Sequence, residues 1–166
     1  MRRSTDRPRS TARAAGAPRR SPPSAPGARR NTSRRSSPIR TRGTIGGSIA
    51  HADPASDLPA CLLALHAEIV ARSAKGERRI PAREFFLGSF QSALAEDELL
   101  VEVILPAGLP NAGSAYCSLE QKASGYAIAG AAAVVVIAPD GSIAFASVGV
   151  TGVSDTPYGA SGVEGA

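Results

Sequence analysis

The large apolar side chains of this chain are confined to one part of it, and this limits where a core can form. Residues 1–42 contain no Leu, Val, Phe, Tyr or Trp, and their only large apolar side chains belong to Met1 and Ile39. Ordering the backbone costs roughly 1–2 kcal/mol per residue, which such a segment cannot offset by burial. We therefore expect residues 1–38 to form a disordered tail and the fold to begin near residue 39.

The net charge of the chain changes sign at nearly the same position, between the tail and the rest of the chain. Residues 1–42 hold thirteen of the nineteen basic residues, all of them Arg, against the single acid Asp6, which gives this segment a net charge of +12. The rest of the chain carries a net charge of −7, so the overall value of +5 belongs to the tail.

Three explanations of the tail are open: an arginine-rich arm that binds nucleic acid, an organelle transit peptide, and the product of a truncated or misread gene. The tail has no aromatic residue on which a base could stack, which argues against nucleic acid as a partner. Its arginines follow no amphipathic period, which argues against a transit peptide.

The cysteines and the hydropathy argue against a metal-binding protein and against a membrane-spanning one. Cys61 and Cys117 lie far apart, and with His51 and His66 they give no spacing typical of a zinc or iron–sulfur site, so we expect no metal. Two reduced thiols indicate a cytoplasmic protein. No run approaches about eighteen consecutive apolar residues, so no membrane span is predicted.

The stretch TIGGSIAHADPASDLPA, which begins at Thr44, has features of a phosphate-binding segment. Gly46 and Gly47 present backbone that no side chain shields, between the hydroxyls of Thr44 and Ser48. Asp57 follows ten residues after Gly47, and its carboxylate could accept hydrogen bonds from sugar-type hydroxyls. An ordinary turn is the alternative explanation of a Gly-Gly pair.

Beyond this stretch the apolar pattern predicts short helices and strands. A helix over residues 55–65 would bury Leu58, Leu62 and Leu65, and His66 would end it without a catalytic role. The other predicted elements are a hairpin over residues 67–80, a short helix over 81–86 with two core phenylalanines, and a strand over 96–106.

The clearest prediction is a hairpin near the end of the chain. Apolar strands at residues 131–138 and 142–150 are joined by Pro139, Asp140 and Gly141, which suit a turn. The alanine-rich run at 129–133 also suits a helix. We predict an α+β fold of mostly antiparallel sheet with short helices.

Read with its lead-in, RTRGTIGGSIAHADPASDLPA resembles the second flavin-contacting segment of the FAD-binding subunit of molybdenum hydroxylases. This family includes the medium chain of carbon monoxide dehydrogenase and the matching part of xanthine dehydrogenase. Its form is roughly R-N-x-G-T-I-G-G-x-x-x-x-A-D-P-x-x-D-x-P, and this chain departs from it at Thr41, where Asn is usual.

The resemblance continues through the family's I-P-x-x-x-F-F segment, matched at residues 80–86, and its strand ending in I-P. From Gly113 it continues into an aromatic-x-K-x-x-R-R/K pattern. There Ser118 stands at the usual Lys and Gln121 at an Arg, which leaves Lys122 as the basic residue of the set.

The resemblance implies an FAD site and no catalytic base or nucleophile. It also implies that residues 39–110 are the second half of a PCMH-type FAD-binding domain and that 111–166 begin the flavoprotein C-terminal domain. The family's first Gly-rich loop, A-G-G-x-S, is not seen, so a fragment is expected. The implied FAD contacts are Thr44, Ile45, Gly46, Gly47 and Ser48 to the pyrophosphate, Asp57 to a hydroxyl-bearing part, and Leu100 to the flavin ring.

The implied function is that of a partial FAD-binding subunit of a molybdenum-hydroxylase oxidoreductase, which relays electrons from iron–sulfur centres through FAD to an acceptor. The implied partners are a molybdopterin-containing large subunit and a 2Fe-2S small subunit. The alternative is a non-enzymatic truncated remnant or a nucleic-acid-binding protein with a basic tail.

The division into tail and folded part predicts the pattern of limited proteolysis. Trypsin should trim the chain to near Arg40 or Arg42 and spare Arg72 and Arg78, because a protease needs mobile backbone. Mass spectrometry identifies the cleavage sites. Cleavage at Arg72 and Arg78 as fast as cleavage near Arg40 and Arg42 would show that residues 39–166 are not folded either.

Overall fold

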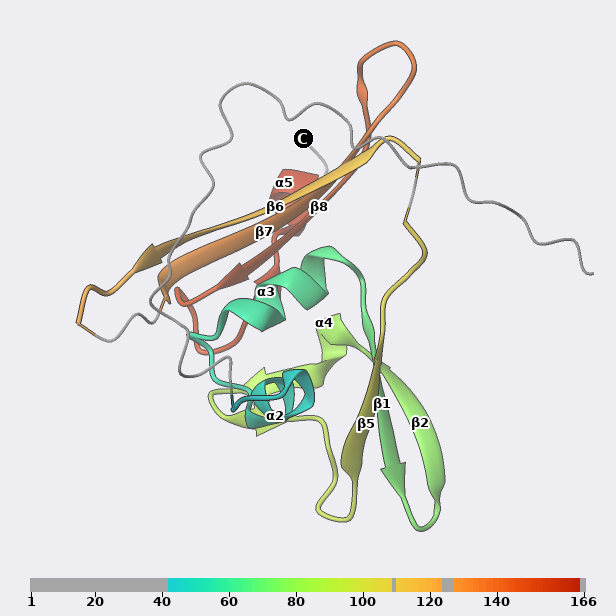
Figure 1. Ribbon diagram of the computed structural model, residues 1–166, viewed down its shortest axis with the longest axis vertical. Helices are drawn as coiled ribbons and strands as arrows, with labels where there is room; N and C mark the ends of the chain where they lie inside the picture. The colour runs from blue at the N-terminus through green and yellow to red at the C-terminus, as the bar shows by residue number, and fades with distance from the viewer. Residues whose placement is uncertain (1–41, 109, 124–126, 165–166) are drawn as a thin grey trace, which may run out of the picture. The chain divides into compact units, whose positions relative to one another are not determined.

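The structure is a computed structural model that describes residues 42–108, 110–123 and 127–164 (Figure 1). The prediction for residues 1–38 lies outside these ranges. The elements in chain order are α2 (Ile45–His51), α3 (Asp57–Ala64), β1 (Glu68–Ser73), β2 (Gly76–Pro81), α4 (Ala82–Phe85), β3 (Phe86–Gly88), β4 (Gln91–Ser92), β5 (Leu99–Ile104), β6 (Ala112–Glu120), β7 (Ala127–Ile137), β8 (Ile143–Thr151), β9 (Tyr158–Gly159) and α5 (Ser161–Glu164).

The described strands pair antiparallel throughout, in the orders β2-β1-β5, β3-β4 and β6-β7-β8-β9. The predicted α+β class with mostly antiparallel sheet and short helices is therefore confirmed. The predicted hairpin over residues 67–80 is β1 and β2, with Ile69 opposite Ile80. The predicted strand at 96–106 is β5, and the predicted helix at 81–86 is α4.

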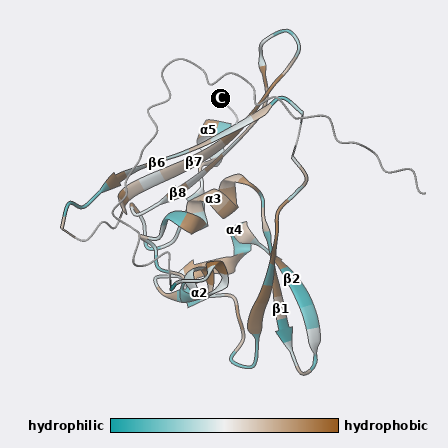
Figure 2. Ribbon diagram, viewed as in Figure 1, coloured by the Kyte–Doolittle hydropathy of each residue, from teal (hydrophilic) through white to brown (hydrophobic). Residues whose placement is uncertain are grey.

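The first core lies where α2, α3 and α4 pack around β1. Ile49, Ile69 and Phe85 are fully buried there, and Phe86 meets Phe85 edge to face with ring centroids 5.3 Å apart. Figure 2 shows β5 as hydrophobic and β2 as hydrophilic over most of its length. This agrees with the burial of β2, whose side chains are exposed except for Ile80, as expected of an edge strand that carries charges.

The second core lies under the four-stranded sheet. The alanine-rich run that also suited a helix is strand β7, because it pairs with β6 on one side and β8 on the other. The predicted turn closes the β7–β8 hairpin: Ala138 N donates to Ser142 O at 2.9 Å, and Gly141 adopts φ 86°. The latter value lies in the left-handed region that glycine adopts without strain.

Helix α3 is buried on two sides, against both cores. Leu62 belongs to the first core, and Ala60 and Ala64 pack against Ala132 of β7 in the second. The predicted burial of Leu62 is confirmed, but Leu58 and Leu65 are only half-buried, and Leu63 is buried in their place. The prediction assumed a helix with one apolar face, whereas α3 lies between two layers.

Close contact between α3 and the sheet needs small residues on both sides. A Cβ added to Gly149 of β8 would collide with the carbonyl oxygen of Ala60. The end of the same strand is tied to the segment before α3, because Thr151 Oγ1 donates to Pro54 O at 2.6 Å and to Ser56 O at 2.8 Å. Thr151 is 1% exposed, so these two hydrogen bonds are shielded from water.

Loss of the Thr151 hydroxyl should therefore destabilise the fold. Thr151→Val keeps the shape but removes the donor to these half-buried carbonyl groups, and we expect the free energy of unfolding to fall by about 1–3 kcal/mol. Urea unfolding followed by circular dichroism measures this change. Ser154→Ala, which removes an exposed hydroxyl, is the control; an equal effect of the two substitutions would contradict the role assigned to Thr151.

A second polar cluster joins α4 to the end of the described chain. Arg83 Nη2 lies 2.5 Å from Glu164 Oε1, which also accepts a hydrogen bond from Val148 N at 2.9 Å. The Arg83 guanidinium packs on Gly159, where an added Cβ would stand 2.5 Å from Nη1. The hydrogen bond from Arg83 lowers the pKa of Glu164 below its ordinary value.

Stability should accordingly fall when Glu164 is protonated. A carboxyl whose pKa is lowered by folding contributes stability above its unfolded pKa, and this is lost as the pH falls through the folded pKa. Wild type should be more stable than Glu164→Gln at neutral pH, and the difference should shrink as the pH falls below the ordinary glutamate pKa of 4.5. Urea titrations from neutral pH to about pH 3 test this, and a pH-independent difference would contradict it.

Candidate functional site

The Gly-rich segment forms the first turn of α2 rather than an open loop. Thr44 is the N-cap, with extended backbone (φ −113°, ψ 154°), and its Oγ1 accepts a hydrogen bond from Gly47 N at 3.0 Å. The first helical hydrogen bond runs from Ser48 N to Thr44 O at 3.1 Å. The sequence prediction overlooked that Thr is a favoured N-cap residue and that such a cap starts a helix at this point.

A side chain on Gly47 would crowd the N-cap, whereas one on Gly46 would come into van der Waals contact with β5. A Cβ on Gly47 would stand 3.0 Å from Thr44 Oγ1, and one on Gly46 would stand 3.4 Å from Leu100 Cδ2. The N–H groups of Ile45 and Gly46 precede the first helical hydrogen bond, and such groups can donate to a ligand. Ile45 and Gly47 are exposed, so this backbone is open to solvent.

Leu100, the residue expected at the flavin ring, lies on β5 beside Gly46. The fold thus brings together two predicted site residues that are distant in sequence. Leu100 is half-buried and packs partly against the first core, which fixes its position.

The Ser48 side chain links α2 to the start of α3. Its hydroxyl lies 3.2 Å from that of Ser56, the N-cap of α3, and its N–H is used within α2. This contact joins the starts of the two helices. It therefore connects the Gly-rich turn to Asp57, the first residue of α3.

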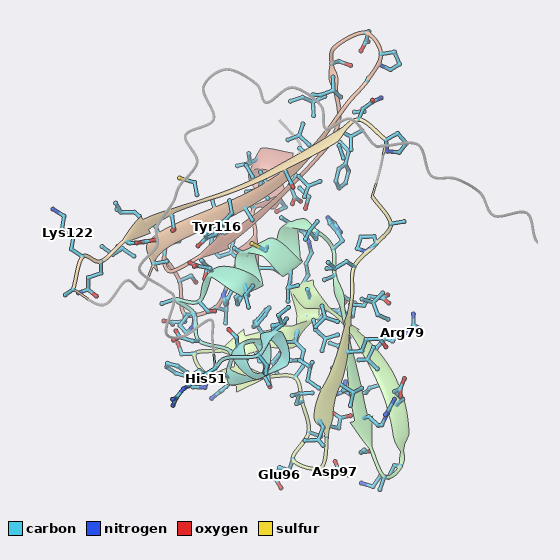
Figure 3. All side chains as sticks on the ribbon, viewed as in Figure 1. His51, Arg79, Glu96, Asp97, Tyr116 and Lys122 are labelled. Atoms are coloured by element: carbon cyan, nitrogen blue, oxygen red, sulfur yellow. The ribbon has the colours of Figure 1, made fainter. Side chains whose placement is uncertain are left out.

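Asp57 is exposed, and its Oδ1 accepts a hydrogen bond from the Tyr116 hydroxyl. In Figure 3 Tyr116 lies at the four-stranded sheet above α3. Burial, and then the hydrogen bond to Asp57, raises the pKa of Tyr116 above its ordinary value. The sequence prediction missed this partner, although a half-buried tyrosine usually hydrogen-bonds through its hydroxyl.

His66 also has a polar partner, but its geometry does not favour acyl-transfer chemistry. Its Nε2 lies 2.9 Å from Ser147 Oγ, and the Ser147 side chain is fully buried and also contacts Arg83 and Glu164. A nucleophile must reach its substrate, so this serine has a structural role. His66 follows the C-cap of α3 and adopts φ 50°, which confirms that the helix ends there.

The arrangement at α2, α3 and β5 can bind rather than catalyse. It offers backbone donors suited to an anion, a carboxylate suited to hydroxyl groups and an apolar side chain suited to a ring. Among the described residues, no three His, Cys, Asp or Glu side chains gather as metal ligands. Within the same ranges, no helix has the length and apolar character needed to cross a bilayer.

Comparison with known proteins gives one consistent result. A family model described as the FAD binding domain in molybdopterin dehydrogenase matches residues 30–108. The 6-hydroxypseudooxynicotine dehydrogenase complex subunit alpha of Paenarthrobacter nicotinovorans is 43% identical over 118 residues, which cover 71% of this chain and 40% of that protein. The carbon monoxide dehydrogenase medium chain of Hydrogenophaga pseudoflava is 39% identical over 118 residues, with coverage of 71% and 41%.

The fold agrees with these sequence relationships. A structure of reconstituted carbon monoxide dehydrogenase from Oligotropha carboxidovorans matches with a TM-score of 0.74 at 35% identity, over 78% of this chain and 45% of that one. The chain spans about two fifths of the length of the two relatives named above, both of which are dehydrogenase subunits. Over the matched residues, the chain belongs to the family of FAD-binding medium chains of molybdopterin dehydrogenases.

Proposed function

We propose that this chain binds FAD and forms part of the electron-transferring subunit of an oxidoreductase of the molybdenum-hydroxylase type. The observation that carries the proposal is the proximity of Gly46 to Leu100, since a Cβ added to Gly46 would stand 3.4 Å from Leu100 Cδ2; a glycine-lined helix start therefore lies next to an apolar side chain. FAD requires this combination, because it has an anionic pyrophosphate and an apolar ring system. When bound, FAD accepts electrons from iron–sulfur centres and passes them to an acceptor.

Each site residue has a distinct part in this proposal. The N–H groups of Ile45 and Gly46 donate to the pyrophosphate, and Gly47 keeps the turn closed against Thr44. Ser48 supports the turn through Ser56 rather than by direct contact. Asp57 contacts a hydroxyl group of FAD. Leu100 contacts the flavin ring.

The protein supplies binding and orientation in this scheme, and no proton transfer is assigned to a side chain. Asp57 is the titratable residue among the proposed contacts, and its Oδ1 already accepts the Tyr116 hydroxyl hydrogen bond. That arrangement suits a fixed acceptor for hydroxyl groups better than a general base, since a base needs an unhindered lone pair.

The assembly is proposed from the relatives, one of which is described as the medium chain of its enzyme. By analogy, a molybdopterin-containing large subunit and a 2Fe-2S small subunit are the partners. Residues 39–110 form the second half of the FAD-binding domain and 111–166 the start of the C-terminal domain. The two free cysteines, Cys61 and Cys117, agree with a cytoplasmic location.

Disturbing the first turn of α2 should weaken FAD binding. In Gly47→Val the added side chain meets Thr44 Oγ1, so the capping hydrogen bond and the direction of the free N–H groups change. Loss of one charge-assisted hydrogen bond corresponds to a loss of affinity of roughly 10- to 100-fold. Titration of the full chain with FAD at several salt concentrations, followed by flavin fluorescence, measures the dissociation constant.

Gly113→Val is the matched control, because an added side chain there meets open space at the exposed start of β6. The control should bind FAD as wild type does, and both variants should keep the wild-type circular dichroism spectrum. Equal affinity of the Gly47 variant and the control would rule out the proposed pyrophosphate site.

A further inference from the structure

The contact between Tyr116 and Asp57 joins two parts of the chain that the sequence separates by 59 residues. Tyr116 belongs to β6 of the four-stranded sheet, and Asp57 begins α3. The phenol ring is half-buried while the carboxylate is exposed. The interaction is therefore fixed on the tyrosine side and open to a ligand on the aspartate side.

The sheet holds the phenol in place independently of Asp57. The ring packs against the small-residue core formed by Ala60, Ala64 and Ala132. The absence of a side chain on Gly130 of β7 leaves the space for it, since a Cβ there would stand 2.5 Å from the Tyr116 hydroxyl oxygen. A tyrosine has only two rotatable side-chain bonds, so this packing fixes the direction in which its hydroxyl points.

The backbone before Asp57 is held by the same sheet. Thr151 Oγ1 donates to the carbonyl groups of Pro54 and Ser56, and Gly152 N donates to Pro54 O at 2.8 Å. Once this backbone is fixed, the remaining freedom of Asp57 is the rotation of its own side chain. The hydrogen bond from Tyr116 selects one of these orientations.

We propose that Tyr116 is a positioning residue for FAD, which orients the Asp57 carboxylate toward the hydroxyl group that this carboxylate binds. The inference rests on the proposed function and extends it to a side chain of the four-stranded sheet. Gly130 shares this role, because it makes room for the phenol. The sheet thus contributes to FAD affinity without touching the cofactor.

The size of the effect follows from the loss of one orienting hydrogen bond. Tyr116→Phe removes the hydroxyl and keeps the ring, so packing against the alanine core is retained. Such a loss corresponds to roughly a three- to tenfold weaker FAD affinity. Asp57→Asn should weaken binding by at least as much, because it removes the proposed charged acceptor itself.

A double-mutant cycle separates positioning from a general structural effect. FAD dissociation constants are measured by fluorescence titration for the full-length wild type, Tyr116→Phe, Asp57→Asn and the double variant. Because Tyr116 acts through Asp57, the double variant should bind FAD within about twofold of Asp57→Asn alone. Tyr158→Phe, at an exposed tyrosine of β9, is the matched control and should bind as wild type does.

A second readout needs no cofactor. Burial and, in addition, the contact with Asp57 raise the pKa of Tyr116, so in Asp57→Asn this phenol should ionise at lower pH than in wild type. Alkaline titration of tyrosinate ultraviolet absorbance detects the shift, and Tyr116→Phe identifies the phenol concerned. An unchanged titration curve would show that the two side chains are not in contact and would overturn the inference.

The possible results also separate this inference from the proposed function. Additive losses in the double variant, or a Tyr116→Phe affinity equal to wild type, would overturn the positioning role while FAD binding stands. Absence of saturable FAD binding to wild type would overturn the proposed function and the inference with it. A loss for Tyr116→Phe that disappears in the Asp57→Asn background supports both.

Discussion

The rest of the structure depends on the position of α3 between two cores. Small residues permit this: an added Cβ on Gly149 would collide with the Ala60 carbonyl oxygen, and Ala64 packs against Ala132 across the same interface. On its other side α3 contributes Leu62 to the core around β1. A bulkier residue at the sheet interface would separate α3 from β8, and the polar contacts at the start of the helix would be lost with it.

Those polar contacts assemble the candidate site. The start of α3 carries Asp57, and it meets Ser48 of α2 through Ser56, Tyr116 of β6 directly, and the end of β8 through Thr151. The turn proposed to bind the pyrophosphate and the carboxylate proposed to bind a hydroxyl group are thereby held at the starts of two linked helices. The geometry suits a cofactor that performs the chemistry itself, because the protein needs only to hold it in one orientation.

In the role proposed for Tyr116, a sheet takes part in binding without touching the ligand. The Tyr116 hydroxyl is directed by packing in the second core, and the carboxylate that it contacts belongs to the candidate site. A hydrogen bond of this kind depends strongly on geometry, because it weakens steeply when donor and acceptor are misaligned. The same reasoning applies to Arg83 and Glu164, which connect α4 to the segment after β9.

The sequence alone determined the elements whose signals are local. Two apolar runs joined by a Pro-Asp-Gly turn specified the β7–β8 hairpin, and the motif around Gly46 and Gly47 indicated the family. Only the tertiary structure decided that α3 is buried on two sides, that Leu100 lies beside Gly46, and that Asp57 is paired with Tyr116. Periodicity identifies which face of an element is apolar, but distant side chains meet only when the layers pack, and that depends on the fit of small residues across the interface.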